Sequence, residues 1–319
     1  MSFASTIKKE LTRLDSKSCC QKAELSALVR MNGTVHIQKK TFTVDIVTEN
    51  PSTARYIFSL VKKLYQVQPE VLVRKKVRLK KNNVYMIRLA SRADQILEDL
   101  YIMKKDSWER VEGISPELIK RSCCKRAYLR GAFLAAGSVN NPDSASYHLE
   151  IVSTYDDHGQ SLCQLMNRFY LHAKVIERKK GFVVYIKEGD KIGEFLNIIG
   201  AHPSLLTFEN VRIMKDMRNS VNRLVNCETA NLNKTIQAAM RQIANIQRID
   251  QEIGLDYLPE RLREVAETRL KYPEANLAEL GQLLPSGKVS KSAVNHRLRK
   301  LEEIAKKFDE HSEKEDQHG

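Results

Sequence analysis

The sequence predicts an α+β protein in which a pseudo-twofold tandem domain is followed by an all-α domain. Three observations support this fold class. The stretch KSCCQKAELSALVRMNGTV at 17–35 returns 104 residues later as RSCCKRAYLRGAFLAAGSV at 121–139, and such self-similarity is typical of a repeat. A strand-like alternation of apolar and polar residues follows both copies, at 42–48 and at 147–153. Beyond about residue 205 the pattern changes to that of helices.

Length and charge limit the classes of function. The chain of 319 residues is long enough for two or three domains. Its 53 Lys and Arg residues outnumber its 39 Asp and Glu residues, which gives a formal net charge of +14. This excess favours a polyanionic partner such as nucleic acid. Because the sequence has neither a signal peptide nor an apolar run of about 18 residues, we expect a cytoplasmic protein without membrane contacts.

The cysteines give no sign of a metal site. Four of the six form two vicinal pairs, without CxxC spacing and without a histidine at zinc-finger distance. In a reducing cytosol such residues are small side chains in helices. We therefore predict no metal, no disulfide and no cofactor.

Each repeat reads helix, strand, strand, helix, strand, strand, helix. The repeats span about 17–104 and 121–200 within a tandem domain at 1–205. The second strand pair of each repeat is a basic hairpin, with its turn at 82–83 in the first repeat and at Gly181 in the second.

The opening helices of the two repeats are expected to pack on each other. Small residues at four-residue spacing leave shallow grooves in which two backbones approach closely. These positions are Ala23, Ala27 and Met31 in the first helix, and Ala127, Gly131 and Ala135 in the second. Gly33 and Gly137 are expected to end these helices with a positive φ.

The repeated helices resemble a known motif. LSALVRMNG at 25–33 and LRGAFLAAG at 129–137 are similar to the nine-residue LAGLIDADG motif of homing endonucleases. The resemblance implies two paired helices at the centre of a DNA-binding saddle, with a catalytic carboxylate at the eighth motif position. Such carboxylates hold the divalent cations that activate water. Because the eighth positions here are Asn32 and Ala136, we predict no catalytic residues and no nuclease activity.

A basic face is expected on the saddle of the first repeat. Side chains of one strand parity share one face of a sheet, and like charges on that face would be relieved by a phosphate backbone. The predicted backbone contacts are Arg74, Lys76, Arg78, Lys80 and Arg88. The second hairpin has only Arg178, Lys179 and Lys180 near its turn, so we expect the two halves to contact DNA unequally.

The C-terminal third is expected to be helical. A linker and long amphipathic helix at 206–256 precede a helix-turn-helix domain at 257–308 and a disordered tail at 309–319. The apolar side of the long helix comprises Leu232, Ile236, Ala239, Ile243, Ile246, Ile249 and Ile253.

The helix-turn-helix pattern occupies about 276–304. A short helix with Leu277, Leu280 and Leu284 leads through Pro285 and Gly287 to a second helix that is capped by Ser290. The apolar residues expected to face inward from the second helix are Val294, Leu298, Leu301 and Ile304. In this arrangement the second helix enters the major groove with its N-terminus first.

The outward side of that second helix carries polar and basic side chains that can contact DNA. The predicted base-reading residues are Lys291, Ser292, Asn295, His296 and Arg299. Lys288, Arg297 and Lys300 are expected to contact phosphates.

Essentially the whole chain resembles the WhiA family of bacterial regulators. This resemblance implies a sequence-specific regulator of transcription that binds double-stranded DNA, associates with the nucleoid, and is linked to sporulation or to cell division and chromosome segregation. Another transcription factor or RNA polymerase is a further candidate partner, and no small-molecule ligand is evident. Two alternatives are an RNA-binding protein of maturase type and a metal-dependent endonuclease that takes its ligands from Asp45 and Glu150.

Overall fold

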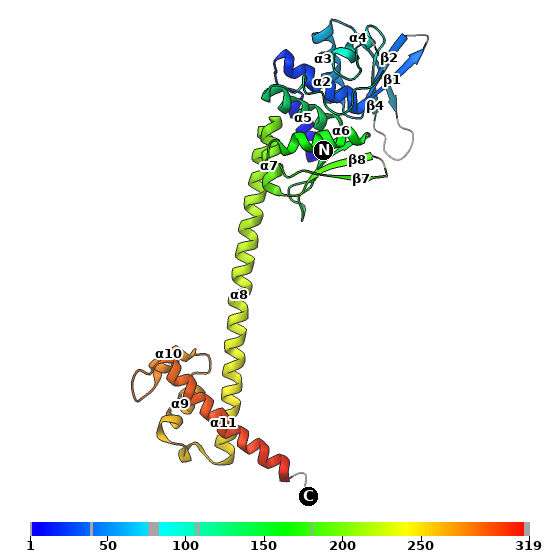
Figure 1. Cartoon of the computed structure of the whole chain (residues 1–319). Helices are drawn as coiled ribbons and strands as arrows, with labels where there is room; N and C mark the ends of the chain where they lie inside the picture. Colours follow the sequence, from blue (N-terminus) through cyan, green and yellow to red (C-terminus); the bar gives the residue numbers. More distant parts are fainter. Residues whose placement is uncertain are drawn as a thin grey trace. The chain divides into compact units, whose positions relative to one another are not determined.

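A computed structural model gives the structure of the chain. It describes residues 2–38, 41–75, 83–105, 107, 109–179 and 181–315, with side chains up to residue 308. The chain divides into two compact units, Met1–Asp216 and Met217–Gly319, which are described separately (Figure 1).

The first unit contains the predicted repeat. Helix α1 (Phe3–Leu11), for which no prediction was made, precedes it. The first repeat consists of α2 (Ser18–Asn32), β1 (Gly33–Gln38), β2 (Thr41–Thr48), α3 (Pro51–Tyr65), β3 (Glu70–Lys75), β4 (Asn83–Leu89) and α4 (Ala93–Asp99). The second consists of α5 (Ser122–Ala136), β5 (Gly137–Val139), β6 (Leu149–Ser153), α6 (Asp156–Asn167), β7 (Lys174–Arg178), β8 (Gly181–Ile186) and α7 (Gly189–Ile199).

Both repeats have the same sheet topology. The strand orders are β1-β2-β4-β3 and β5-β6-β8-β7, and all pairs are antiparallel. One face of each sheet packs against helices. The buried residues on these faces include Val44 and Ile46 in β2, and Leu149 and Ile151 in β6. The pseudo-twofold α+β fold is therefore confirmed.

Helices α2 and α5 pack directly on each other (Figure 1). A Cβ atom at Gly131 would lie 2.5 Å from the carbonyl oxygen of Glu24 and 3.0 Å from the Cβ of Ala27. Contacts this close are possible only when the interface residues are small. The spacing of small residues thus correctly predicted the packing of the two helices.

The predicted reason for the glycines that follow these helices is wrong. Gly33 has φ −89° and Gly137 has φ −76°, so neither is in the left-handed region. Each helix instead continues directly into a strand. A Cβ at Gly33 would lie 2.3 Å from the carbonyl oxygen of Val29, and a Cβ at Gly137 would lie 2.3 Å from the ring of Phe133. Close approach therefore accounts for these glycines.

The turns of the two hairpins are described to different extents. The turn of the second lies where it was predicted, because β8 begins at Gly181, which has φ +127°. In the first hairpin, Asn83 begins β4 and Asn82 lies outside the described residues.

The second unit is helical, as predicted. Helix α8 (His202–Glu252) begins in the first unit and contributes its residues from Met217 onward to this one, and Gly254 follows with φ +79°. After the 3₁₀ turn η1 (Leu255–Tyr257) come α9 (Glu260–Lys271), α10 (Leu277–Leu283) and α11 (Lys291–Glu315). The backbone of α11 continues beyond residue 309, where the tail was expected to begin. The Glu and Lys residues there have high helix propensity.

The apolar stripe predicted between Leu232 and Ile253 of α8 is only partly buried. Ile246 and Ile249 are fully buried in the core of the second unit, whereas Leu232 is 59% exposed and Ile236 is 47% exposed. Only part of this stripe therefore belongs to the core of the second unit. Among the described residues, no helix has both the length and the apolar character needed to cross a membrane.

An ion pair in the first unit gives a pH-dependent prediction. Arg110 donates two hydrogen bonds, 2.9 and 3.0 Å long, to Asp157 at the start of α6, and the Gly113 amide donates a third. The Arg110 guanidinium is the main reason why the pKa of Asp157 falls to about 2 from an ordinary value of 3.8. Because the folded pKa is the lower one, the stabilisation is present above pH 4 and is lost as the pH falls towards 2.

We expect Asp157→Asn to lower the free energy of unfolding at pH 7 by about 2 kcal/mol. The difference from the parent should shrink as the pH falls from 4 towards 2. Urea denaturation followed by circular dichroism at several pH values measures this. Asp156→Asn is the matched control, because Asp156 lies in the same helical turn but is exposed and has no arginine partner among the described residues. Equal losses for both variants would contradict the prediction.

Candidate nucleic-acid interface

The local sequence positions α10 and α11 through caps and a close contact. Asn276 and Glu279 form a capping box at the start of α10. Gly281 lies against the next segment, where the Val289 amide donates a 2.8 Å hydrogen bond to the Gly281 carbonyl. Ser290 caps α11 as predicted, with its hydroxyl accepting a hydrogen bond from the Ala293 amide. The loop between the helices is thereby fixed at both ends.

The inner side of α11 is apolar, as predicted. Val294, Leu298 and Leu301 are buried, and Ile304 packs at the edge of the same core. The buried Arg269 of α9 was not foreseen. Its guanidinium donates to the carbonyls of Pro273 and Ala275, at 3.3 and 2.6 Å, and so holds the connection that leads into α10.

The outer side near the start of α11 carries the predicted base-reading residues. Lys291, Ser292, His296 and Arg299 are exposed, and Asn295 is half-buried beside them. Their positions in the helix place all five on one side, because residues three or four apart share a face. Their contacts with bases stay predictions.

The predicted phosphate contacts divide into two groups. Lys288 and Lys300 are exposed. Arg297 is half-buried, and its Nη1 atom is enclosed without a hydrogen-bond partner in the part of the chain that the structure describes. Within that part, neither Lys288 nor Lys291 nor Arg299 has an acidic partner, whereas Lys306, farther along α11, pairs with Glu302 at 2.9 Å. The start of α11 therefore presents positive charge that no acidic residue in the described part of the chain pairs with.

On the open face of the first sheet, one of the two predicted basic residues that the structure describes is paired with an acid. Arg74 is exposed and shares this face with Arg88, as the strand register requires. Arg88, however, donates hydrogen bonds of 2.7 and 2.8 Å to Asp45 on the neighbouring strand. Lys76, Arg78 and Lys80 lie outside the described residues. Sequence parity placed Arg88 correctly but did not reveal its acidic partner.

The second sheet repeats this arrangement. Glu150 lies 3.3 Å from Arg178 and 3.2 Å from His148, while Asp45 has Arg88 and, at 3.3 Å, His36. Asp45 and Glu150 occupy equivalent positions in the repeated strand segments. Hydrogen bonds from Arg88 hold the pKa of Asp45 below its usual range.

The C-terminal ends of α2 and α5 meet beside a cavity. The Asn32 side chain donates to the Ala135 carbonyl at 3.5 Å, and Ala136 follows, half-buried. Lys8 and Glu49 are the charged residues among those described around this cavity. Burial lowers the pKa of Lys8 to about 8. The motif ends thus present an amide and a methyl group where a paired-carboxylate site would need two acids.

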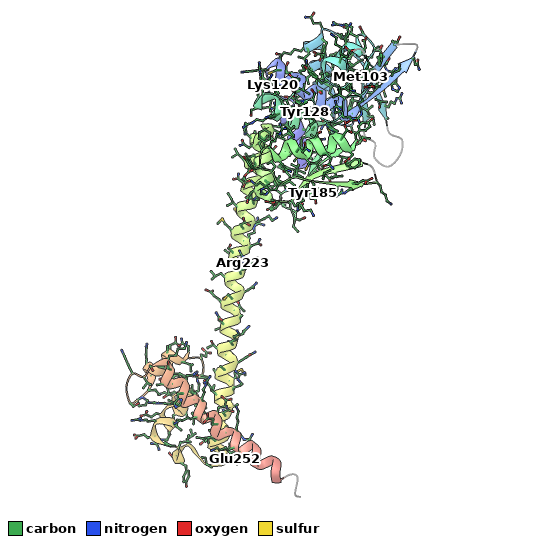
Figure 2. The ribbon with its side chains drawn as sticks, in the orientation of Figure 1. Met103, Lys120, Tyr128, Tyr185, Arg223 and Glu252 are labelled. Carbon is green, nitrogen blue, oxygen red and sulfur yellow. The ribbon has the colours of Figure 1, made fainter. Side chains whose placement is uncertain are left out.

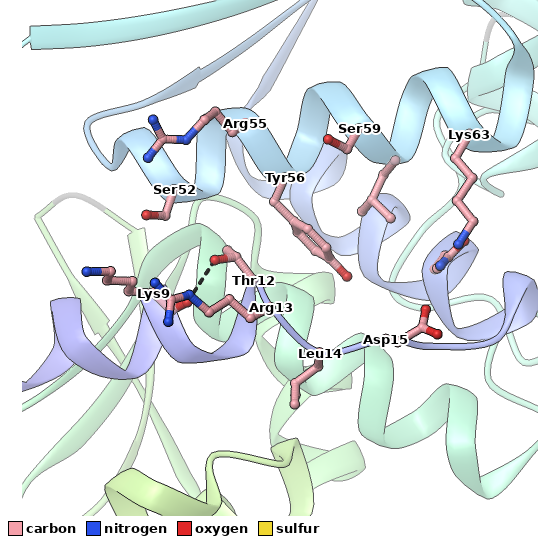
Figure 3. A pocket seen from close by; sticks show the side chains of 12 residues that line it. Lys9, Thr12, Arg13, Leu14, Asp15, Ser52, Arg55, Tyr56, Ser59 and Lys63 are labelled. Atoms are coloured by element: carbon pink, nitrogen blue, oxygen red, sulfur yellow. Dashed lines mark hydrogen bonds between the residues drawn. The ribbon is translucent and has the colours of Figure 1, made fainter.

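Two further features of the first unit were not predicted from the sequence. Cations line a pocket around Tyr56, and Figure 3 shows them: Lys9 of α1, Arg13 just after α1, and Arg55 and Lys63 of α3, with Asp15 as the acid. Tyr128, labelled in Figure 2, is fully buried and its hydroxyl lies 2.9 Å from His158 Nε2. Burial lowers the pKa of His158 to about 3, so this pair is a neutral core contact.

Fold and surfaces together define a class: a tandem LAGLIDADG-like protein that also carries a C-terminal helix-turn-helix. Three family models match the chain: the WhiA N-terminal LAGLIDADG-like domain at 18–103, the WhiA LAGLIDADG-like domain at 125–218 and the WhiA C-terminal HTH domain at 221–305. The chain belongs to the WhiA family.

Individual relatives agree with this assignment. The chain is 61% identical over 308 residues to a "Probable cell division protein WhiA" of Bacillus licheniformis, covering 97% of both chains. It is also 61% identical over 309 residues to the protein of the same name from a Geobacillus species, covering 97% of this chain and 96% of that one. The crystal structure of full-length DUF199/WhiA from Thermatoga maritima is similar, with 27% identity, a TM-score of 0.61 and coverage of 96% and 99%.

Proposed function

We propose that this protein is a sequence-specific regulator of transcription that binds double-stranded DNA through α11. The observation that carries the proposal is the row of exposed polar and basic side chains at the start of α11, backed by the apolar packing of a helix-turn-helix. Lys291, Asn295 and Arg299 would read bases, since Arg and Lys suit guanine and Asn suits adenine. Lys288 and Lys300 would contact phosphates and set the register.

The regulated process would be cell division and chromosome segregation, or sporulation, and the protein would reside on the nucleoid. The names of its relatives support a role in division. Another transcription factor or RNA polymerase is a candidate partner. The saddle face of the first unit would add contacts to the DNA backbone through Arg74, which is exposed.

A nuclease function is disfavoured. Asn32 and Ala136 stand at the motif positions that hold metal-binding carboxylates in active enzymes of this fold. Asp45 and Glu150, the alternative ligands, are each paired with an arginine. A metal ion would have to displace that arginine before either carboxylate could serve it.

The test compares two single-charge deletions on the same helix. We expect Arg299→Ala to lose about 1–3 kcal/mol, roughly 5- to 150-fold, in affinity for the preferred site, because a lost base contact removes discrimination. Lys306→Ala, the control, removes one positive charge from an exposed position that is already ion-paired. It should change binding to specific and random duplexes alike, and only slightly. Affinities at one fixed salt concentration, on a site mapped by crosslinking to the chromosome, measure both effects.

Three outcomes would contradict the proposal. If Arg299→Ala retains the preference of the parent for its site, α11 does not read sequence there. If structured RNA outcompetes duplex DNA, the maturase-type alternative gains support. If the purified protein cleaves DNA at defined sites with Mg²⁺, and a chelator abolishes this cleavage, the endonuclease alternative gains support.

A further inference from the structure

The two vicinal cysteine pairs meet at the N-terminal ends of α2 and α5. The Sγ atoms of Cys19, Cys20, Cys123 and Cys124 all lie within 4.8 Å of one another. Within the pairs, the sulfur atoms are 4.0 Å apart for Cys19 and Cys20, and 3.9 Å apart for Cys123 and Cys124. Each repeat therefore contributes two of the four thiols to one cluster.

These distances suit a tetrahedral metal centre. With zinc–sulfur bonds of about 2.3 Å, the sulfur atoms of a four-thiolate site are about 3.8 Å apart. Both vicinal pairs are already close to that spacing. Movements of less than about 1 Å would bring the remaining pairs of sulfur atoms to it.

The surroundings act on the thiols in both directions: burial raises the pKa of Cys20 and Cys124, whereas two helix N-termini and two cations favour thiolates. Neither α2 nor α5 has a side-chain cap, and the residues that precede the helices are Lys17 and Arg121. The free amide groups of two helix N-termini and these cations stabilise nearby thiolates. Cys20 and Cys124 are buried, while Cys123 is exposed, so a metal ion has a route of entry from solvent.

We propose that these four cysteines bind one zinc ion that clips the two repeats together. Soft thiolate ligands select zinc over hard cations such as Mg²⁺. Each thiol releases its proton to solvent as it binds, so that one Zn²⁺ and four thiolates form a centre of charge −2. The two helix N-termini, Lys17 and Arg121 offset that charge. The ion would hold the N-terminal ends of α2 and α5 together, whereas Asn32 and Ala136 lie at their C-terminal ends.

Sequence spacing predicted no metal because the ligands come as vicinal pairs about 100 residues apart. A CxxC pattern reports ligands that one loop brings together. Here the packing of two helices does so, and that packing is a property of the fold.

The test uses the full chain, purified under reducing conditions and titrated with Co²⁺ as a spectroscopic substitute for Zn²⁺. The parent should bind one equivalent and show both the thiolate-to-cobalt charge-transfer band and the visible bands of tetrahedral Co²⁺. Cys19→Ser/Cys123→Ser removes one ligand from each pair at the two less buried positions. It should weaken binding by more than about 100-fold, since even outer-shell changes cost 10- to 100-fold.

Matched controls come from the remaining cysteines. Cys163→Ser and Cys227→Ser, at a half-buried and an exposed position, should bind Co²⁺ as the parent does. Zinc should also raise the thermal midpoint of the parent above that of the chelated protein, with no such shift in the double variant. Circular dichroism of the metal-free double variant verifies that it is folded.

Three results would overturn the proposal: a parent without the tetrahedral cobalt spectrum, a folded double variant that keeps the affinity of the parent, or a disulfide within this cluster in protein isolated under reducing conditions.

Discussion

Arg130→Met is expected to lower the free energy of unfolding of the first unit by about 3–5 kcal/mol, because it leaves a buried charge without its partner. Glu24 is completely buried in α2, and Arg130 of α5 reaches it with Nε at 2.9 Å and Nη2 at 2.8 Å. Tyr56 donates a further hydrogen bond to the same carboxylate. Burial raises the pKa of Glu24 while Arg130 opposes that rise. Without Arg130, Glu24 must either take up a proton or stay charged and unpaired.

Urea denaturation followed by circular dichroism measures this loss. The informative control is the double variant Glu24→Gln/Arg130→Met, which removes both charges and should recover part of the stability, since replacing a whole buried pair is tolerated better than breaking it. A loss below about 1 kcal/mol for Arg130→Met, the range of exposed pairs, would show that water or another cation compensates Glu24.

Gly281→Ala is expected to destabilise the second unit by about 2–4 kcal/mol, through steric overlap in the core. The added Cβ would lie 2.1 Å from the carbonyl oxygen of Val289 and 3.4 Å from Val294 Cγ2. The first of these atoms belongs to the backbone, so no side chain can rotate away. The segment that leads into α11 would have to shift, and we expect site-specific DNA binding to weaken along with stability.

Gly287→Ala is the matched control, because a Cβ there would meet nothing within 4 Å although φ is +103°. It should cost only the backbone strain, about 1–2 kcal/mol. Thermal unfolding and binding to the preferred site are measured for both variants. If Gly281→Ala is no more damaging than Gly287→Ala, the loop before α11 can move freely and the close contact does not position that helix.

Features that depend on local pattern were predictable from the sequence. The repeat, its succession of helices and strands along the chain, and the small-residue contact of α2 with α5 follow from spacing, because neighbours in a helix or strand are fixed by its period. The Ser290 cap and the inward Val294 and Leu298 follow for the same reason. The outward placement of Arg299 follows as well, whereas its contact with a base is a prediction for the binding assay.

Features that depend on pairing between distant segments were not predictable. The partner of Arg88 is set by the register of β2 against β4, and the sequence gives only the parity of each strand. Gly33 looked like a left-handed cap because helices commonly end that way, but a helix that continues into a strand needs room beside Val29 instead. Leu232 fits an amphipathic pattern, yet a pattern does not say whether another element covers it.

The ion pair between α2 and α5 also distinguishes the two repeats from each other. Glu24 and Ser26 occupy the repeat positions that Tyr128 and Arg130 occupy 104 residues later. Two copies of the first repeat meeting through α2 would bury two carboxylates opposite serines. Two copies of the second, meeting through α5, would bury two arginines opposite tyrosines. Either self-pairing leaves buried charges without partners, and each unpaired charge costs several kcal/mol of desolvation free energy. If the tandem arose by duplication and fusion of a gene for a symmetric homodimer, the contact between its halves has since become asymmetric. Each repeat now pairs favourably with the other repeat and unfavourably with a second copy of itself.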